Sequence, residues 1–210
     1  MTANIAVLDY GSGNLHSVCQ SLAAVGATVH LSSRQQELDG CDGLVLPGVG
    51  AFAACMAGIG AGEHDRYRPW LSDWVRQGRP LLGICVGHQV LFEQGIEHGV
   101  ETAGLGALPG VVEKLPARRL PHIGWDTVEA AADSAMLAGL DGKRFYFVHS
   151  YGVLAMPPSV TKVSWCESDG RFVAAVESGP IWGTQFHPEK SGQAGAHLLR
   201  NWLAAVAANL

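Results

Sequence analysis

The chain has 210 residues, which is enough for one domain with a full hydrophobic core, and we expect residues 1–210 to form a single domain. Charged residues make up 16% of it and the net charge is −5, which excludes the basic surface of a typical nucleic-acid-binding protein. The five cysteines are odd in number and include no Cys-x-x-Cys pair, which argues against a disulfide framework and a zinc ribbon. Free thiols suit a reducing compartment, so we expect a cytoplasmic protein.

Neither a signal peptide nor a membrane helix is expected. The first four residues lack a basic start, and a strand-like segment follows at once. The uncharged stretch 43–62 is long enough to cross a bilayer, but Pro47 and its many glycines oppose a continuous helix. A strand, a glycine loop and a short helix are predicted there instead.

Strand-like and helical segments alternate in the first half of the chain. Strands are expected at 5–9, 28–32, 43–46 and 80–84. Helices are expected at 14–25, at 65–77, and from 88 to 94 as the start of a longer one. Such alternation predicts a parallel sheet whose two faces are covered by helices.

The second half is dominated by strands. Strand-like runs occupy 111–115, 125–129, 145–148, 160–165, 172–176 and 181–185, and an amphipathic helix at 193–208 follows. The short gaps between these strands indicate antiparallel pairing. The predicted fold class is therefore α/β, with an open, mostly parallel twisted sheet flanked by helices and an antiparallel extension in the second half.

A short apolar run at 80–84 leads directly to Cys85, which has Gly83 and Gly87 two residues away on either side. This is the pattern of a strand-to-helix elbow with a nucleophile at its tip, here with Cys in place of Ser. Glycine at both flanking positions avoids collision with neighbouring backbone. The alternative interpretation is a small buried apolar cysteine, which is the commoner fate of this residue.

A cysteine nucleophile needs a base, and the base needs a group that orients it. Among nine histidines the best candidate is His187, which follows a predicted strand and is separated from Glu189 by one proline. The alternative is an ordinary solvated turn. Oxyanion donors are expected from the Val86 N–H and from the glycine loop at 47–50, which is otherwise a plain tight turn.

These motifs together resemble the class I (triad) glutamine amidotransferase family. The resemblance rests first on Gly83-Ile84-Cys85-Val86-Gly87-His88-Gln89 and on His187-Pro188-Glu189. It is narrowed by Pro47-Gly48-Val49-Gly50-Ala51-Phe52, Pro121-His122-Ile123-Gly124-Trp125 and Tyr146-Phe147-Val148-His149-Ser150-Tyr151. Within the family, these segments are similar to the glutaminase subunits of imidazole glycerol phosphate synthases. The similarity extends from Ile5 to the last helix and leaves no residues for a synthase domain.

The resemblance implies a role for particular residues in glutamine hydrolysis through a Cys thioester. Cys85 would attack the amide, His187 would carry the proton, and Glu189 would orient His187. The oxyanion hole would use Val86 N–H and a flipped peptide around Val49–Gly50. Substrate binding would involve Gln89, Glu97, Ser150 and Tyr151, and neither a metal nor an organic cofactor is implied.

The resemblance also implies a partner, a cyclase subunit with a (β/α)8 barrel, which would use the ammonia to make imidazole glycerol phosphate and AICAR. The positions that would face this partner are Asn14, Trp125, Tyr146 and Lys190. Two positions depart from the usual pattern of these subunits: His88 stands where Met is common, and Asp126 where Asn is frequent. A carboxylate cannot donate the hydrogen bond that an amide would.

Three alternative functions are considered. Two belong to other classes of protein, and the third is a glutaminase that serves another synthase. A dinucleotide-binding oxidoreductase is suggested by Gly11 and Gly13 after a strand and by Arg34, but His16 stands where the fingerprint requires a third glycine. A non-catalytic redox sensor would keep the cysteine and lack the His-x-Glu motif. A glutaminase subunit of another synthase, such as pyridoxal phosphate synthase, would share the two triad motifs and lack the narrower segments.

Overall fold

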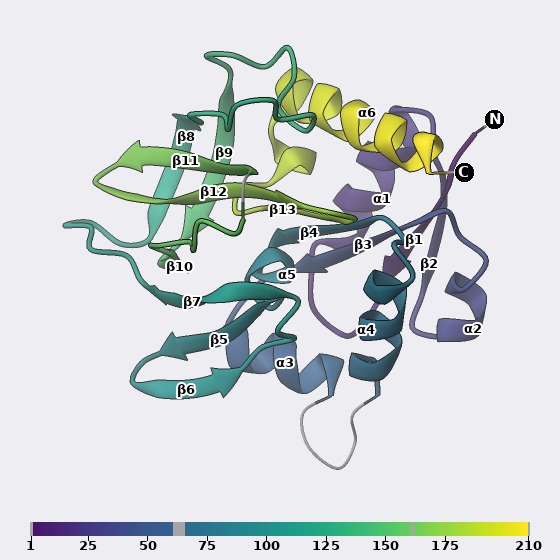
Figure 1. Cartoon of the computed structure of the whole chain (residues 1–210), viewed down its shortest axis with the longest axis horizontal. Coiled ribbons are helices and arrows are strands. Elements are labelled where there is room, and N and C mark those ends of the chain that lie inside the picture. Colours follow the sequence, from purple (N-terminus) through teal and green to yellow (C-terminus); the bar gives the residue numbers. More distant parts are fainter. Residues whose placement is uncertain (1, 61–65, 161, 210) are drawn as a thin grey trace.

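A seven-stranded sheet runs through the centre of the computed structural model, which describes residues 2–60, 66–160 and 162–209 (Figure 1). In spatial order its strands are β11 (Lys162–Ser168), β12 (Gly170–Ser178), β13 (Ile181–Thr184), β4 (Leu81–Cys85), β3 (Gly43–Gly48), β1 (Asn4–Leu8) and β2 (Thr28–Ser32). Neighbours from β13 to β2 are parallel, and β11–β12 and β12–β13 are antiparallel. The predicted parallel sheet with an antiparallel extension is confirmed.

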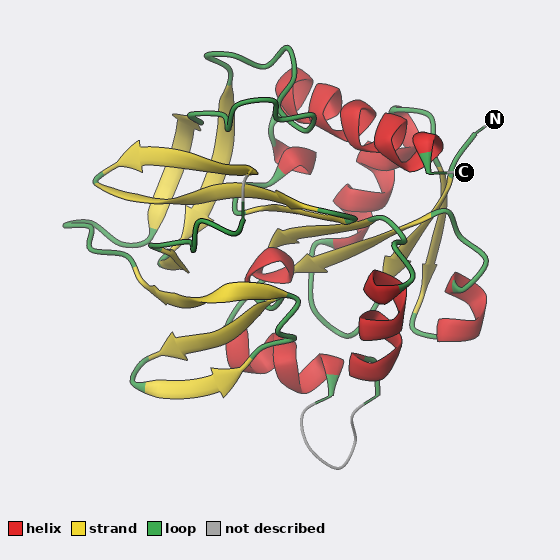
Figure 2. Cartoon of the chain, viewed as in Figure 1, coloured by secondary structure: helices red, strands yellow, loops and turns green. Residues whose placement is uncertain are grey.

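Helices cover both faces of this sheet (Figures 1 and 2). One face carries α1 (Leu15–Ala24) and α6 (Gly192–Ala208), and the other carries α3 (Phe52–Ile59), α4 (Arg68–Arg76) and α5 (Val86–Gln89). A short α2 (Gln35–Leu38) lies beside the edge strand β2. Because both faces are covered, β3, β4 and β13 are buried at every residue, as expected of central parallel strands.

Two smaller sheets complete the fold. One has the order β10 (Tyr151–Val153), β7 (Leu108–Lys114), β5 (Phe92–Glu97), β6 (Val100–Ala103). The other is an antiparallel pair, β8 (His122–Thr127) with β9 (Arg144–His149), and a single 3-10 turn, η1 (Pro188–Lys190), precedes α6. Figure 2 shows these strands gathered on the side of the molecule away from α2.

The prediction of a helix continuing from 88 to 94 was wrong. The helix after the elbow ends at Gln89, and the chain enters β5 at Phe92. The apolar run there fits a strand as well as a helix, and pairing of Phe92 with Leu108 decides for the strand. Gly95 on this strand lies against the ring of Phe52, with no room for a side chain.

The other predicted elements are present within a few residues, apart from the parts that fall outside the described residues. Those parts are positions 61, 62 and 65 of the early uncharged and helical segments, and position 161 of the strand at 160–165. The stretch 43–60 forms a strand, a loop and the helix α3, as predicted. Across the described ranges, every helix is too short or too polar to cross a membrane.

Candidate active site

The elbow places Cys85 at the end of β4, in the middle of the central sheet. Its backbone has φ 55° and ψ −114°, a conformation that non-glycine residues rarely adopt. Strain of this kind persists only where the surroundings hold it, and it is concentrated at functional sites. The side chain is 3% exposed, and α5 begins at the next residue, Val86.

The glycines of the elbow are required by close backbone contacts. A Cβ on Gly83 would lie 2.8 Å from the Gly87 carbonyl oxygen, and a Cβ on Gly87 would lie 1.9 Å from the Leu46 carbonyl oxygen. A Cβ on Gly48 would lie 2.4 Å from the Gly87 nitrogen. The end of β3 therefore packs backbone to backbone against the elbow, which explains all three glycines.

His187 follows β13, the strand next to β4, so the parallel pairing brings it to the same end of the sheet as Cys85. Its Nδ1 lies 2.7 Å from Glu189 Oε1, and both side chains are 2% exposed. Because a carboxylate only accepts, Nδ1 carries a proton, and Nε2 is the ring nitrogen left to exchange a proton with other groups. The backbone is fixed as well, since His187 N–H donates to the Tyr146 carbonyl at 2.9 Å.

The environment of His187 favours its cationic form. Burial opposes the charge, but the hydrogen bonding and charge of Cys85 and Glu189 outweigh burial and raise the pKa of His187 to about 9. His187 Nε2 is buried and has no hydrogen-bonding partner of ordinary geometry within the described chain. Cys85 and His187 line the same cavity, so the structure brings the predicted nucleophile and base together.

A cavity of about 310 Å³ opens beside Cys85 and His187. Ten of its lining residues were predicted as site or interface residues: Val49, Gly50, Cys85, Val86, Gln89, Glu97, Ser150, Tyr151, His187 and Lys190. Glu189 lies behind His187 rather than on the wall. The sequence therefore predicted most of the wall, and the roles assigned to these residues remain predictions.

The oxyanion loop is in a conformation in which the peptide N–H and carbonyl of Val49 are bonded to Ser12. Val49 N–H donates to Ser12 Oγ at 3.2 Å, and the Ser12 hydroxyl donates to the Val49 carbonyl at 2.8 Å. The Cys55 thiol also lies 3.5 Å from that carbonyl. Gly50 has φ 92°, and a Cβ at this position would meet no atom within 4 Å, so glycine here permits the backbone conformations that a flip of the Val49–Gly50 peptide requires.

The predicted substrate-binding residues line the same cavity as the loop, and two of them are held by hydrogen bonds. Gln89 Nε2 donates to the Tyr151 carbonyl at 2.8 Å and to Gln185 Oε1 at 2.9 Å, which occupies both of its hydrogens. Only the Gln89 oxygen is left for a ligand. Glu97 Oε2 accepts a hydrogen bond from Phe52 N–H at 2.9 Å, so its second oxygen is the one available to the cavity.

Three of the four predicted interface residues form one cluster. The ring of Trp125 lies edge-on to Tyr146 at 5.9 Å, and Lys190 Nζ lies 5.9 Å above the Tyr146 ring. Asn14 lies at the start of α1, where the preceding Gly13 packs against Pro47. The structure therefore brings together the aromatic and cationic positions and leaves Asn14 on a different element.

Sequence reasoning missed four residues of the site. Val148 and His149 line the cavity, Gln185 Nε2 lies 3.8 Å from Cys85 Sγ, and Ser12 holds the oxyanion loop. Val148 and His149 lie inside the motif at 146–151, and Gln185 lies two residues before His187, so these positions were an available signal. No signal in the sequence pointed to Ser12, because its loop is far from Val49 along the chain. No group of three or more His, Cys, Asp or Glu in the described ranges is arranged to hold a metal.

The geometry agrees with comparisons to known proteins. A profile of the family described as glutamine amidotransferase class-I matches residues 6–206, so the chain belongs to that family. The imidazole glycerol phosphate synthase subunit HisH of Nocardia farcinica is 54% identical over 210 residues, covering 97% of this chain and 98% of the relative. That of Thermobifida fusca is 52% identical over 214 residues, covering 98% and 100%. Within the class, the chain is a member of the HisH subunit family.

Solved structures support the fold. A crystal structure described as a glutamine amidotransferase superposes with a TM-score of 0.74 at 19% identity, covering 97% of this chain and 98% of that one. The PurLQS structure from Thermotoga maritima gives a TM-score of 0.76 at 19% identity, covering 98% and 100%. At such identities the likeness concerns the fold alone, and it confirms the predicted class.

Proposed function

We propose that this chain is the glutaminase subunit of an imidazole glycerol phosphate synthase in histidine biosynthesis. The observation that carries the proposal is the buried His187–Glu189 pair, 2.7 Å apart, with His187 on the wall of a cavity that Cys85 also lines. A nucleophile, a base and an orienting carboxylate are the parts that acyl transfer through a thioester requires. The similarity to HisH subunits supports glutamine as the substrate.

In the proposed reaction, the Cys85 sulfur attacks the side-chain amide carbon of glutamine. His187 takes the thiol proton and delivers it to the leaving nitrogen, so ammonia departs and a glutamyl thioester remains. Water, deprotonated by His187, then hydrolyses the thioester to glutamate. Glu189 keeps the Nδ1 proton in place, so that Nε2 alone exchanges protons with the substrate.

The oxyanion would be held by Val86 N–H and by Val49 N–H after its peptide rotates. Val49 N–H is bonded to Ser12 in this conformation, so the isolated chain has only part of its oxyanion hole. We therefore expect low activity for the free chain and activation when the loop changes. The oxygen of Gln89 and the groups at Glu97, Ser150 and Tyr151 would hold the amino-acid end of glutamine.

A partner surface adjoins the cavity mouth. Ile123 is 59% exposed, Trp125 is 44% exposed, and Val49 is 41% exposed, which are high values for large apolar side chains. Ile123 pairs with Val148 and Trp125 pairs with Tyr146 across β8–β9, and Val148 also lines the cavity. Apolar side chains gathered in this way are typical of a protein–protein interface. We propose that a cyclase subunit covers them and receives the ammonia.

Tyr146 gives this surface a direct connection to the base. Its carbonyl accepts the His187 N–H, and its N–H donates to Ser191 Oγ, which in turn donates to the His187 carbonyl at 2.6 Å. A partner that contacts Trp125 and Tyr146 therefore acts on the backbone of His187 through these hydrogen bonds. We further propose a (β/α)8 barrel for the partner, a cytoplasmic location and a single amidotransferase domain, with no cofactor used in the hydrolysis.

The test is to mix the chain with the cyclase of the histidine pathway, then to measure glutamate release with and without the cyclase ligand. Cys85→Ala should lower glutamate release by at least ~10⁴-fold and leave association unchanged. The matched control is Cys19→Ala, which removes a half-buried thiol from α1 and should keep the activity. A Cys85→Ala protein that still releases glutamate would refute the proposal. So would a chain that neither binds the cyclase nor changes its rate of glutamate release when the cyclase is added.

A further inference from the structure

The end of the oxyanion loop is held by a different group from its start. The loop leaves β3 at Gly48 and enters α3 at Phe52. Phe52 N–H donates to Glu97 Oε2 at 2.9 Å, a bond between residues 45 positions apart in the sequence. Glu97 is the last residue of β5, and it also lines the substrate cavity. One carboxylate therefore adjoins both the end of the loop and the space proposed for glutamine.

The Glu97 carboxylate supplies what the start of α3 lacks. The residue before the helix is Ala51, whose side chain cannot accept a hydrogen bond, and the first turn of α3 contains no acidic residue. The first N–H groups of a helix have no partner within it, and they favour a negative charge nearby. Glu97 accepts from one of these groups across the space between two elements, so the bond caps α3 and ties it to β5.

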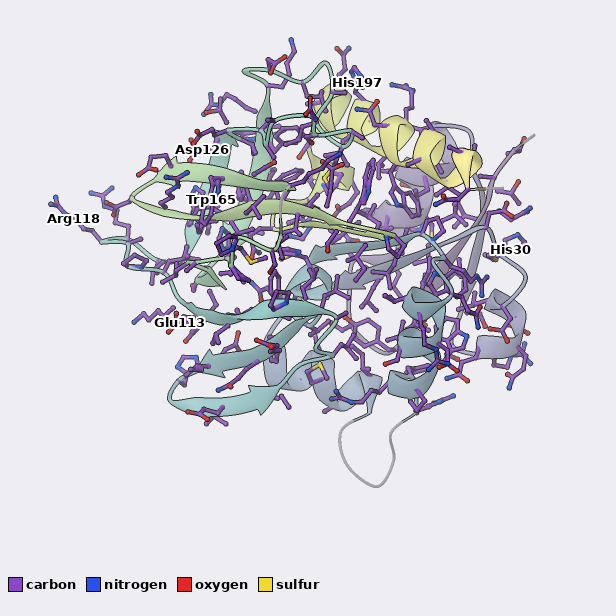
Figure 3. All side chains as sticks on the ribbon, viewed as in Figure 1. His30, Glu113, Arg118, Asp126, Trp165 and His197 are labelled. Carbon is purple, nitrogen blue, oxygen red and sulfur yellow. The ribbon has the colours of Figure 1, made fainter. Side chains whose placement is uncertain are left out.

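Packing holds Phe52 at the same place. A Cβ on Gly95, two residues before Glu97, would lie between 2.6 and 2.7 Å from ring atoms of Phe52. The ring therefore lies directly on the backbone of β5, and β5 is itself paired on both sides, with β6 and with β7. Glu113, labelled in Figure 3, belongs to β7. Phe52 is thus fixed by its ring and by its N–H to a strand in the interior of a sheet.

The two ends of the loop are therefore held in different ways. At the start, Val49 is bonded to the Ser12 hydroxyl, and at the end, Phe52 is fixed to β5. Only Gly50 and Ala51 lie between these two residues. A rotation of the Val49–Gly50 peptide must be taken up within this short segment. The position of Phe52 therefore decides where the rotated N–H group comes to lie.

We propose that Glu97 has two functions, one for each oxygen of its carboxylate. Oε2 anchors the end of the oxyanion loop, which makes Glu97 a positioning residue of the oxyanion hole, and the other oxygen receives the ammonium group of glutamine. One side chain then places the substrate and the oxyanion donor relative to each other. The inference rests on the proposed glutaminase function.

Two replacements of Glu97 separate these functions. Glu97→Gln loses the charge that attracts an ammonium group but keeps an oxygen that can accept from Phe52 N–H, whereas Glu97→Ala loses both. We expect KM for glutamine to rise at least ~10-fold in both variants, because the charged contact is lost. In Glu97→Ala, kcat should also fall at least ~10-fold, because the oxyanion donor is no longer held in place. In Glu97→Gln, kcat should stay within about three-fold of the wild type.

The same strand offers a matched control. Glu93 Oε2 accepts a hydrogen bond from Gly110 N–H at 3.0 Å, so Glu93 makes the same kind of contact as Glu97. Gly110 belongs to β7, and Glu93 is not among the described residues that line the substrate cavity. Glu93→Gln and Glu93→Ala should therefore keep KM and kcat within about two-fold of the wild type.

The experiment measures KM and kcat for glutamine with the wild type and the four variants, each in complex with the cyclase and its ligand. Hydrogen exchange of backbone amides is recorded by NMR on the same chains without the cyclase. The Phe52 amide should lose protection in Glu97→Ala and keep it in Glu97→Gln, while the amides of β3 and β4 stay protected in both. This pattern, together with a fall in kcat only in Glu97→Ala, would support the proposal.

Equal kcat values in the two Glu97 variants would overturn the proposal, because Glu97 would then act on the substrate alone. A Phe52 amide that stays protected in Glu97→Ala would overturn it as well. The exchange measurement does not depend on activity. A wild-type complex that releases no glutamate, with faster Phe52 exchange only in Glu97→Ala, would therefore reject the proposed function while upholding the anchor of the loop.

Discussion

The elbow and the oxyanion loop both line the cavity and differ in how tightly their backbones are held. At the elbow, a side chain on Gly83 or Gly87 would meet backbone atoms at 2.8 Å or less. At the loop, Gly50 has no atom within 4 Å of the place a Cβ would take. The backbone around Cys85 is therefore fixed by packing, whereas Val49 in the loop is held by hydrogen bonds to Ser12. Glycine thus serves a tightly packed position at the elbow and an open one in the loop.

The largest expected effect comes from adding a side chain at the tightly packed elbow. Gly87→Ala places a methyl group 1.9 Å from the Leu46 carbonyl oxygen. The nearest atoms all belong to the backbone, so relief of the overlap requires the strand itself to move. We expect a loss of at least ~3 kcal/mol in the free energy of unfolding, measured by urea denaturation. Gly40→Ala is the control, because its added methyl meets open space and should change stability by less than ~0.5 kcal/mol. Equal effects of the two changes would contradict the packing argument.

The next effect concerns the charged partner of the base. Glu189→Gln keeps the size of the side chain but removes the charge that helps to raise the pKa of His187. We expect kcat/KM for glutamine to fall ~10²–10⁴-fold, because the proton on Nδ1 is no longer held by a carboxylate. The pH at which His187 titrates in the activity profile should also be lower in this variant. A variant with unchanged pH profile would show that Glu189 does not orient the base.

Part of the free energy of unfolding should also depend on pH, through the protonation of His187. The folded state favours the cation of His187, so its stabilisation is complete below the ordinary pKa of about 6.5. That stabilisation is lost as pH rises through about 9. We expect a decrease of at most about 3 kcal/mol over this window in urea unfolding. Cys85→Ala removes one partner of His187, so its decrease should be smaller. A decrease of the same size in both proteins would exclude the Cys85–His187 interaction as its source.

The smallest expected effect concerns the oxyanion loop. Ser12→Ala removes the two hydrogen bonds between Ser12 and Val49. Each such bond is worth about 1 kcal/mol, so the free chain should release glutamate up to ~30-fold faster, and activation by the cyclase should shrink accordingly. The control is Ser17→Ala, which removes a hydroxyl from α1 at a distance in sequence from the loop and should not change the rate. Slower hydrolysis in Ser12→Ala would mean that Ser12 supports the active loop conformation instead.

Several parts of this protein were predictable from local patterns. The apolar runs of β1, β3 and β4 and the spacing of Leu15, Val18 and Leu22 in α1 identified the α/β alternation. The glycines around Cys85 identified the elbow for a steric reason that holds in any fold. The prediction failed after Gln89, where an apolar run suits a helix or a strand and pairing with Leu108 decides.

By itself, the sequence determined the chemistry: a cysteine that only a strained turn can present, a histidine with a carboxylate two residues on, and glycines where backbones approach. Only the tertiary structure decided how distant segments meet. It joined Ser12 to Val49, and Asp126 through His122 to His149, by contacts between residues from 4 to 37 positions apart. Steric demands of the backbone are local and leave a mark on the sequence. Hydrogen bonds between side chains from different strands depend on register and sheet order, which no short segment encodes.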